Sequence, residues 1–83
     1  MTFTPARLTN QERSVLRPVA LAYRRAYRAG AAHLECCAAA LTEFRRLCAD
    51  APADDRAASG EVNRMIAAAI NADAQWFWHG PDA

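Results

Sequence analysis

The sequence predicts an all-α protein, built as a small helical bundle or as a long helical hairpin. Its 83 residues include 21 alanines and ten arginines. Alanine, leucine and arginine are strong helix formers, whereas the β-branched residues that favour strands are few. Apolar positions also recur at alternating intervals of four and three, which is the spacing of one helix face. A chain of this length forms one domain, and we assign it to residues 1–83.

The N-terminal part is predicted to be an extended arm over 1–8, followed by a short helix over 10–17. Thr9 is suited to cap this helix, and Glu12 follows three residues later, which is the spacing of a capping box. Pro18 removes one backbone donor and disfavours the helical conformation of the residue before it. We therefore expect the helix to kink or break at Pro18.

A long helix is predicted over 18–49, because the apolar or small positions keep one phase along this stretch. They are Leu16, Ala20, Tyr23, Tyr27, Gly30, Leu34, Cys37, Leu41, Phe44 and Cys48. The helix can also end at Gly30, since glycine suits the position that follows a helix. A break there gives three helices, over 10–29, 31–49 and 60–78. No side chain directly after Gly30 is suited to cap a new helix, so we favour the continuous one.

The stretch over 50–58 is predicted to connect the long helix to the last one. It contains a proline and a pair of aspartates, which interrupt the helical pattern. The last helix is predicted over 58–78. His79, Gly80 and Pro81 then form a stop signal, because a cation suits the end of a helix and proline cannot continue it.

Both tryptophans of the chain flank a phenylalanine near the end of this last helix. Successive helical residues turn by about 100°, so one helix cannot bury all three rings against the same partner. The phase places Trp76 and Phe77 toward the core and Trp78 on the polar face. Trp78 then either stacks on an arginine of the first helices or serves as an anchor for a partner.

Charge is divided unevenly along the chain. Residues 1–30 hold six arginines and one glutamate, or 6 − 1 = +5, whereas residues 31–83 hold four arginines and eight acids, or 4 − 8 = −4. The two halves sum to the net charge of +1. This asymmetry fits either a polyanionic partner or two halves that face each other.

The sequence also carries expectations about location. Its first residues lack a basic segment followed by an apolar one, so we expect no signal peptide. No apolar run approaches the roughly 20 residues that span a bilayer, so we expect no membrane partner. We predict a cytoplasmic protein whose three cysteines are reduced thiols.

One row of arginines is the strongest candidate for a binding surface. Arg13, Arg17, Arg24 and Arg28 are spaced by four, seven and four residues, so they share a face of any helix that continues past the proline. Such a face suits phosphates or an acidic protein surface; the alternative is a solvated face partly paired with acids of the same chain. The residues that we predict to bind a partner are Arg17, Arg24, Arg25, Arg28, Tyr23, Tyr27 and Trp78.

Neither a metal site nor a catalytic site is predicted. His33 and Cys37 lie one turn apart, but Cys36 points in another direction. Cys37 and Cys48 belong to the apolar face, where a free cysteine acts as a small buried hydrophobe. The sequence contains no glycine-rich phosphate loop and no spacing typical of a nucleophile with its base. We therefore expect no enzyme, no metal and no cofactor.

These patterns favour a small non-enzymatic protein-interaction module, acting as an adaptor or an inhibitor. The long helix has more apolar surface than the last helix can cover, which favours a protein partner or a homodimer. The alternative function is a nucleic-acid-associated regulator, or an inhibitor of nucleic-acid machinery of the phage or mobile-element type. That alternative uses the stripe of Arg13, Arg17, Arg24 and Arg28.

Overall fold

In a computed structural model, the protein is described over residue 8 and residues 10–80, and the prediction of an all-α bundle is confirmed. The four helices are α1 (Asn10–Arg28), α2 (His33–Leu47), α3 (Asp55–Ala72) and α4 (Ala74–His79). Within these residues no strand is present. The predicted Thr9 cap, and the predicted arm over 1–8 apart from Leu8, lie outside the described residues.

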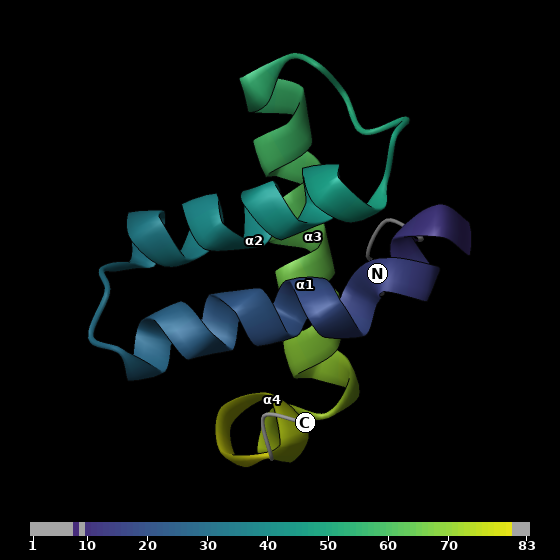
Figure 1. Cartoon of the computed structure of the whole chain (residues 1–83). Coiled ribbons are helices and arrows are strands. Elements are labelled where there is room, and N and C mark those ends of the chain that lie inside the picture. The colour runs from purple at the N-terminus through teal and green to yellow at the C-terminus, as the bar shows by residue number, and fades with distance from the viewer. Residues whose placement is uncertain (1–7, 9, 81–83) are drawn as a thin grey trace, which may run out of the picture.

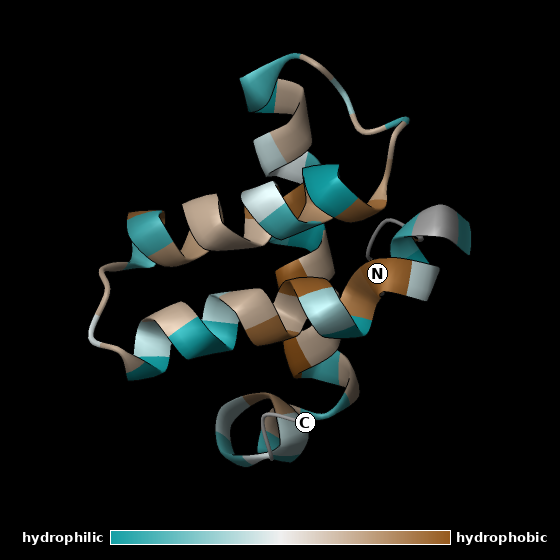
Figure 2. Ribbon diagram, in the orientation of Figure 1, coloured by the Kyte–Doolittle hydropathy of each residue, from teal (hydrophilic) through white to brown (hydrophobic). Residues whose placement is uncertain are grey.

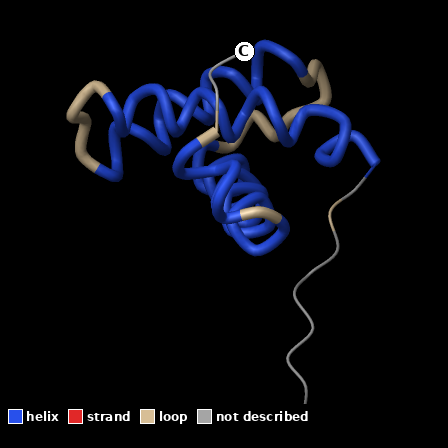
Figure 3. Tube along the Cα trace, turned by 90° about the horizontal axis from the view of Figure 1, so that it is seen from below, coloured by secondary structure: helices blue, strands red, loops and turns tan. Residues whose placement is uncertain are grey.

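The helices form two layers. α1 and α2 lie side by side and run in opposite directions, and α3 crosses behind them at a steep angle (Figure 1). The view from below shows the same crossing, with α3 seen nearly end-on beneath the α1–α2 pair (Figure 3). The short helix α4 follows α3 and packs against α1 as well as α3. The C-terminal part of the described chain is therefore brought back to the first helix.

The first correction concerns Pro18, because α1 continues through this residue to Arg28 and the predicted separate helix over 10–17 is wrong. Proline in a helix interior costs about 3 kcal/mol, whereas burial of one large apolar side chain contributes about 1.5–3 kcal/mol. Val19 and Tyr23 both follow the proline, and both are buried. Packing of this segment thus outweighs the lost backbone hydrogen bond.

The second correction concerns Gly30, where the predicted continuous helix over 18–49 is interrupted. Gly30 has a φ angle of +93°, a conformation that favours glycine. Its amide donates to the Tyr27 carbonyl at 3.0 Å, and the Ala31 amide donates to the Ala26 carbonyl at 3.0 Å. This pair of bonds is a Schellman motif, which ends α1 and reverses the chain within four residues.

α2 begins without a capping side chain, and this is the feature of the sequence that predicts a continuous helix. The N-cap residue is Ala32, and no side chain caps the first turn. The absence of a capping residue after Gly30 was therefore a correct observation, but it did not prevent a new helix. Packing against α1 and α3 supplies the stability that a cap would otherwise add.

The third correction concerns the last helix, which was predicted over 58–78 and is divided at Asp73. α3 begins at Asp55, where the Asp54 carboxylate accepts a hydrogen bond from the Ala57 amide at 3.1 Å. α3 ends at Ala72, and the Asp73 carboxylate accepts the Trp76 amide at 3.0 Å. An aspartate that caps a second helix competes with continuation of the first, so α4 leaves in a new direction.

The core lies where the three long helices meet. Figure 2 shows hydrophobic positions of α1 and α3 gathered around their crossing. The buried residues come from all four helices, and several are small, which allows close approach of the backbones. They include Val19, Ala20, Tyr23, Cys36, Ala40, Phe44, Val62, Met65, Ile66, Ala69 and Phe77.

Candidate functional site: the arginine face of α1

The arginines of the predicted stripe do not all point to solvent: one is buried and the others are exposed. Arg24 lies in the interior, with only 1% of its surface exposed. Arg13, Arg17, Arg25 and Arg28 are exposed on the same helix. The continuous basic face that the spacing predicted is thus interrupted at its centre.

Arg24 and Arg28 hold α4 against α1. Nη1 of Arg24 donates to the carbonyl oxygens of Trp76, at 2.6 Å, and Phe77, at 3.4 Å. Nη2 of Arg28 donates to the carbonyl oxygens of Trp78, at 2.9 Å, and Gly80, at 3.2 Å. The last carbonyls of a helix lack partners within it and carry partial negative charge. The two arginines therefore cap the end of α4 from a neighbouring helix.

The aromatic residues predicted to meet a partner also contact aromatic rings of the same chain. The ring of Trp78 lies 5.2 Å from the Tyr27 ring and 4.8 Å from the Phe77 ring, measured between centroids. Tyr23 is buried, and its ring lies 5.8 Å from that of Phe77. Trp76, predicted to be buried, is half-buried together with Trp78, so only Phe77 of the three enters the core. The division at Asp73 changes the helical phase and so explains this difference.

The guanidinium groups of two arginines pack against the Trp76 indole. Cζ of Arg17 lies 4.6 Å from the centroid of the indole, and Cζ of Arg24 lies 5.1 Å from it. Cation–π contacts of this kind contribute about 0.5–2 kcal/mol each, depending on exposure. The indole Nε1 is buried and has no hydrogen-bond partner among the described residues. Trp76 thus orders the exposed side chain of Arg17.

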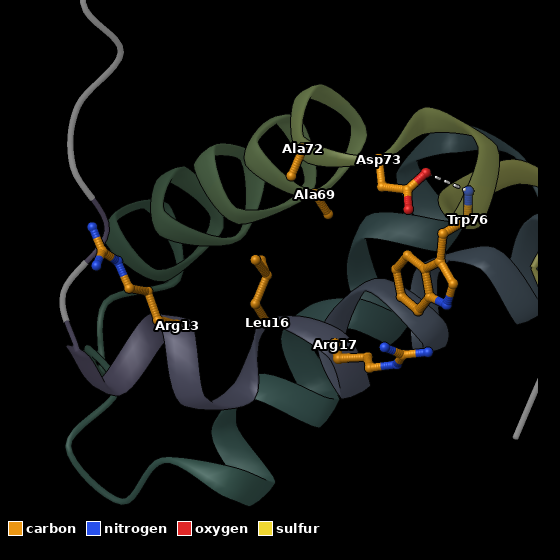
Figure 4. Close-up of a pocket in the computed structure, with 7 residues that line it drawn as sticks. All are labelled: Arg13, Leu16, Arg17, Ala69, Ala72, Asp73 and Trp76. Carbon is orange, nitrogen blue, oxygen red and sulfur yellow. Dashed lines mark hydrogen bonds between the residues drawn. The ribbon is translucent and has the colours of Figure 1, made fainter.

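A groove lies beside this stacked pair, between α1 and α3. It has a volume of about 290 Å³. In Figure 4, Leu16 points from α1 toward Ala69 and Ala72 of α3, while Arg17 extends beneath the indole at one end. The seven lining residues of this α1–α3 groove are Arg13, Leu16, Arg17, Ala69, Ala72, Asp73 and Trp76. Its floor is apolar, and cationic side chains border it.

Sequence reasoning missed most of this groove. It selected Arg13 and Arg17 through the arginine stripe and Leu16 as part of an open apolar end. It assigned Ala69, Ala72 and Trp76 to the core. The usable signal is the order of residues on α1, where an apolar Leu16 lies between Arg13 and Arg17 along one edge. The partner wall, however, depends on the division at Asp73, which the pattern did not predict.

Two large apolar side chains are exposed near the turn between α1 and α2, one on each helix. Tyr27 is 52% exposed and Leu34 is 80% exposed. Sequence reasoning selected Tyr27 but placed Leu34 on the buried face of a continuous helix. The break at Gly30 removes the common phase of the two helices, so Leu34 points to solvent.

A chain of polar contacts links α1, α2 and α3 near this turn. The Tyr23 hydroxyl lies 2.8 Å from Nδ1 of His33, and the Cys37 sulfur lies 3.5 Å from Nε2 of the same ring. The Cys37 thiol also donates to Oδ1 of Asn63 at 3.7 Å. Burial raises the pKa of Cys37 and of Tyr23, and the neighbouring Cys36 raises both further. A raised pKa keeps the thiol protonated, which opposes both nucleophilic attack and metal ligation.

Groups of metal ligands and membrane-spanning helices are both absent from the described residues. In that part of the chain, no group of three or more His, Cys, Asp or Glu side chains is placed to hold a metal ion. No helix in it combines the length and the apolar character needed to cross a membrane. Comparison with protein-family models, curated proteins and solved structures finds no match for the chain.

Proposed function

We propose that this protein is a small non-enzymatic interaction module, an adaptor or an inhibitor, that binds a protein partner through the α1–α3 groove. The observation that carries the proposal is the exposed Arg17 stacked on Trp76 beside an apolar floor. Arginine and tryptophan are the residue types that dominate binding energy at protein interfaces. A side chain that is already ordered also loses less entropy when a partner binds.

The polar groups at the groove suit binding better than acid–base chemistry. Arg13 and Arg17 present several N–H donors and no acceptor, which suits them to bind anionic or carbonyl groups. The Asp73 carboxylate caps α4 by accepting the Trp76 amide. The proposal therefore assigns the groove no catalytic step. It retains the predicted cytoplasmic location, which the free cysteines of the chain support.

The alternative function, binding to nucleic acid or inhibition of its machinery, relied on the continuous arginine stripe. Arg24 is enclosed under α4, and Arg28 donates to two carbonyl oxygens of the same chain. Two exposed arginines beside an apolar groove fit a protein partner better than a row of phosphates. A phosphate backbone has no apolar group that would cover the floor of the groove. These placements favour the protein partner.

A second copy of the chain is a further partner that we propose, at a different surface. Tyr27 is 52% exposed and Leu34 is 80% exposed, on the two helices that the turn joins, and exposed large apolar side chains are candidate association sites. Solution mass at low micromolar concentration tests this point. We expect a dimer for the wild-type chain and a monomer for Leu34→Asp; a wild-type monomer contradicts the dimer without affecting the groove.

The proposed function is tested by affinity capture from the native host, followed by mass spectrometry. The compared baits are wild type, Arg17→Glu and the control Arg56→Glu, which makes the same charge change at an exposed position of α3. We expect one protein to be recovered with wild type and with Arg56→Glu, but not with Arg17→Glu. Recovery of the same proteins with all three baits contradicts the proposal.

A further inference from the structure

We infer that the α1–α3 groove recognises an acidic amphipathic helix of the partner protein. The inference rests on the proposed function and adds the chemistry of the ligand. In this arrangement two carboxylates of the partner meet Arg13 and Arg17, and an apolar side chain between them enters the space above Leu16. Ala69 and Ala72 of α3 form the opposite wall.

Arg17 is oriented to receive a carboxylate. The Trp76 indole covers one face of its guanidinium, which leaves the in-plane N–H groups at the edge. Within the described part of the chain, no carboxylate pairs with Arg17. A planar guanidinium can bind both oxygens of a carboxylate through two parallel hydrogen bonds, and stacking on an aromatic ring fixes its orientation. The stacked pair is therefore a preformed carboxylate site.

Arg13 supplies a second cation at a defined spacing. It lies four residues before Arg17 on α1, and its side chain extends from the opposite end of the groove, away from Arg17 (Figure 4). Two glutamates four residues apart on a partner helix lie on one face of that helix, and their flexible side chains can extend toward the two ends of the groove. The two cations therefore favour a helical ligand with acids at positions i and i+4 over a single anion.

The groove also contains one carboxylate, but its position does not oppose such a ligand. Arg13, Arg17 and Asp73 are the charged lining residues, so the charges sum to 2 − 1 = +1. The Asp73 carboxylate is directed toward the amide of Trp76, as the dashed line in Figure 4 marks. Its negative charge thus faces the N-terminus of α4, where it is stabilised.

The apolar floor distinguishes a peptide from other anions. Leu16 is half-buried, Ala69 is buried, and Ala72 is exposed, so the small α3 side chains leave room above Leu16. The volume of about 290 Å³ lies near the lower limit of ligand pockets. It suits one or two apolar side chains from the face of a helix, which is a common mode of peptide recognition.

The test uses a synthetic helical peptide with two glutamates four residues apart and a leucine on the same face. Binding is followed by the fluorescence of Trp76 in a Trp78→Phe background, which removes the other indole. We expect saturable binding that weakens as salt is raised. Replacing both glutamates by glutamine should weaken binding about tenfold or more, since the charge-assisted hydrogen bonds are lost.

Matched protein variants locate the contact. Arg17→Gln should weaken binding about tenfold, whereas Arg56→Gln should leave it unchanged. Ala72→Glu, at an exposed helical position, should block the groove while circular dichroism reports an intact fold. Equal binding of the glutamate and glutamine peptides, equal binding by Arg17→Gln and wild type, or the absence of saturable binding would overturn the inference.

Two results separate this inference from the proposed function. A DNA or RNA oligonucleotide that displaces the peptide and binds more tightly overturns both, in favour of a nucleic-acid ligand. Capture of a host protein that depends on Arg17, without binding of the acidic peptide, overturns the ligand chemistry alone and leaves the interaction module standing.

Discussion

The buried guanidinium of Arg24 donates to the carbonyl oxygen of Trp76 across 2.6 Å, which joins the middle of α1 to α4. The two residues are 52 positions apart in the chain. The same guanidinium lies against the indole of Trp76. α4 is therefore fixed to α1 at one side chain by both a hydrogen bond and a stacking contact. This link also positions the indole on which Arg17 rests.

Replacement of Arg24 by methionine tests this link. The Trp76 and Phe77 carbonyls lose charged donors in a buried place, so we expect the free energy of unfolding to fall by about 2–4 kcal/mol. Urea denaturation followed by circular dichroism measures the change. The adjacent exposed Arg25 is the control, and Arg25→Met should change stability by about 0.5 kcal/mol or less. Equal effects of the two substitutions would contradict the interior role of Arg24.

Gly30→Ala should destabilise the protein by about 1–2 kcal/mol, because the φ angle of +93° strains any residue with a Cβ atom. No atom lies within 4 Å of the added carbon, so the cost is one of backbone conformation. Gly60→Ala is the matched control inside α3, where the added carbon meets only Arg64 Nη1 at 4.0 Å. It should stabilise by about 0.5–1 kcal/mol. Thermal melts that move in the same direction for both variants would argue against the Schellman turn.

Asp73→Ala should cost about 1 kcal/mol, because the Trp76 amide loses its capping acceptor. Asp73→Asn keeps an acceptor at this position and should restore most of the stability. Tryptophan fluorescence reports on α4 directly, since both indoles belong to this helix. We expect a red shift for the alanine variant and little change for asparagine. A shift of equal size in both would show that the charge of Asp73, rather than its cap, holds α4.

Alkaline pH should weaken the fold through Cys37 and Tyr23. Burial raises the pKa of both groups in the folded state, so the folded protein binds more protons than the unfolded chain at high pH. Their contribution to stability is complete below the ordinary thiol pKa of about 8.5 and is lost as the pH rises through the raised values. Urea midpoints between about pH 8 and 11 measure this loss. Cys37→Ser should flatten the first part of the decline; an unchanged profile would exclude Cys37 as its source.

The sequence was sufficient for the helical class but not for the ends of the helices. Composition and the spacing of apolar residues depend on local preferences, and these agree with the structure. The break expected at Pro18 is absent, because burial of the following residues offsets the cost of proline. The break at Gly30 is present, although no side chain caps the next helix. Both outcomes depend on packing between helices, which a spacing rule does not contain.

The candidate site was predictable only in part for the same reason. The arginine spacing on α1 selected Arg13 and Arg17, and both lie at the groove. Arg24 points inward because α4 packs against it. The position of α4 depends in turn on the change of chain direction at Asp73. Trp76 and Trp78 are both half-buried, rather than one buried and one exposed, because the helical phase assumed for them ran through that change. Leu34 was likewise assigned to the core by a phase that ends at Gly30.

Amide chemical-shift mapping by NMR tests the central claim, that the α1–α3 groove is the partner site, most directly. The labelled protein is titrated with the acidic helical peptide and, separately, with the captured partner. The account predicts that the shifted signals cluster at Arg13–Arg17, at Ala69–Asp73 and at the Trp76 indole N–H. Shifts confined to the turn between Tyr27 and Leu34, with an unchanged groove, would contradict it.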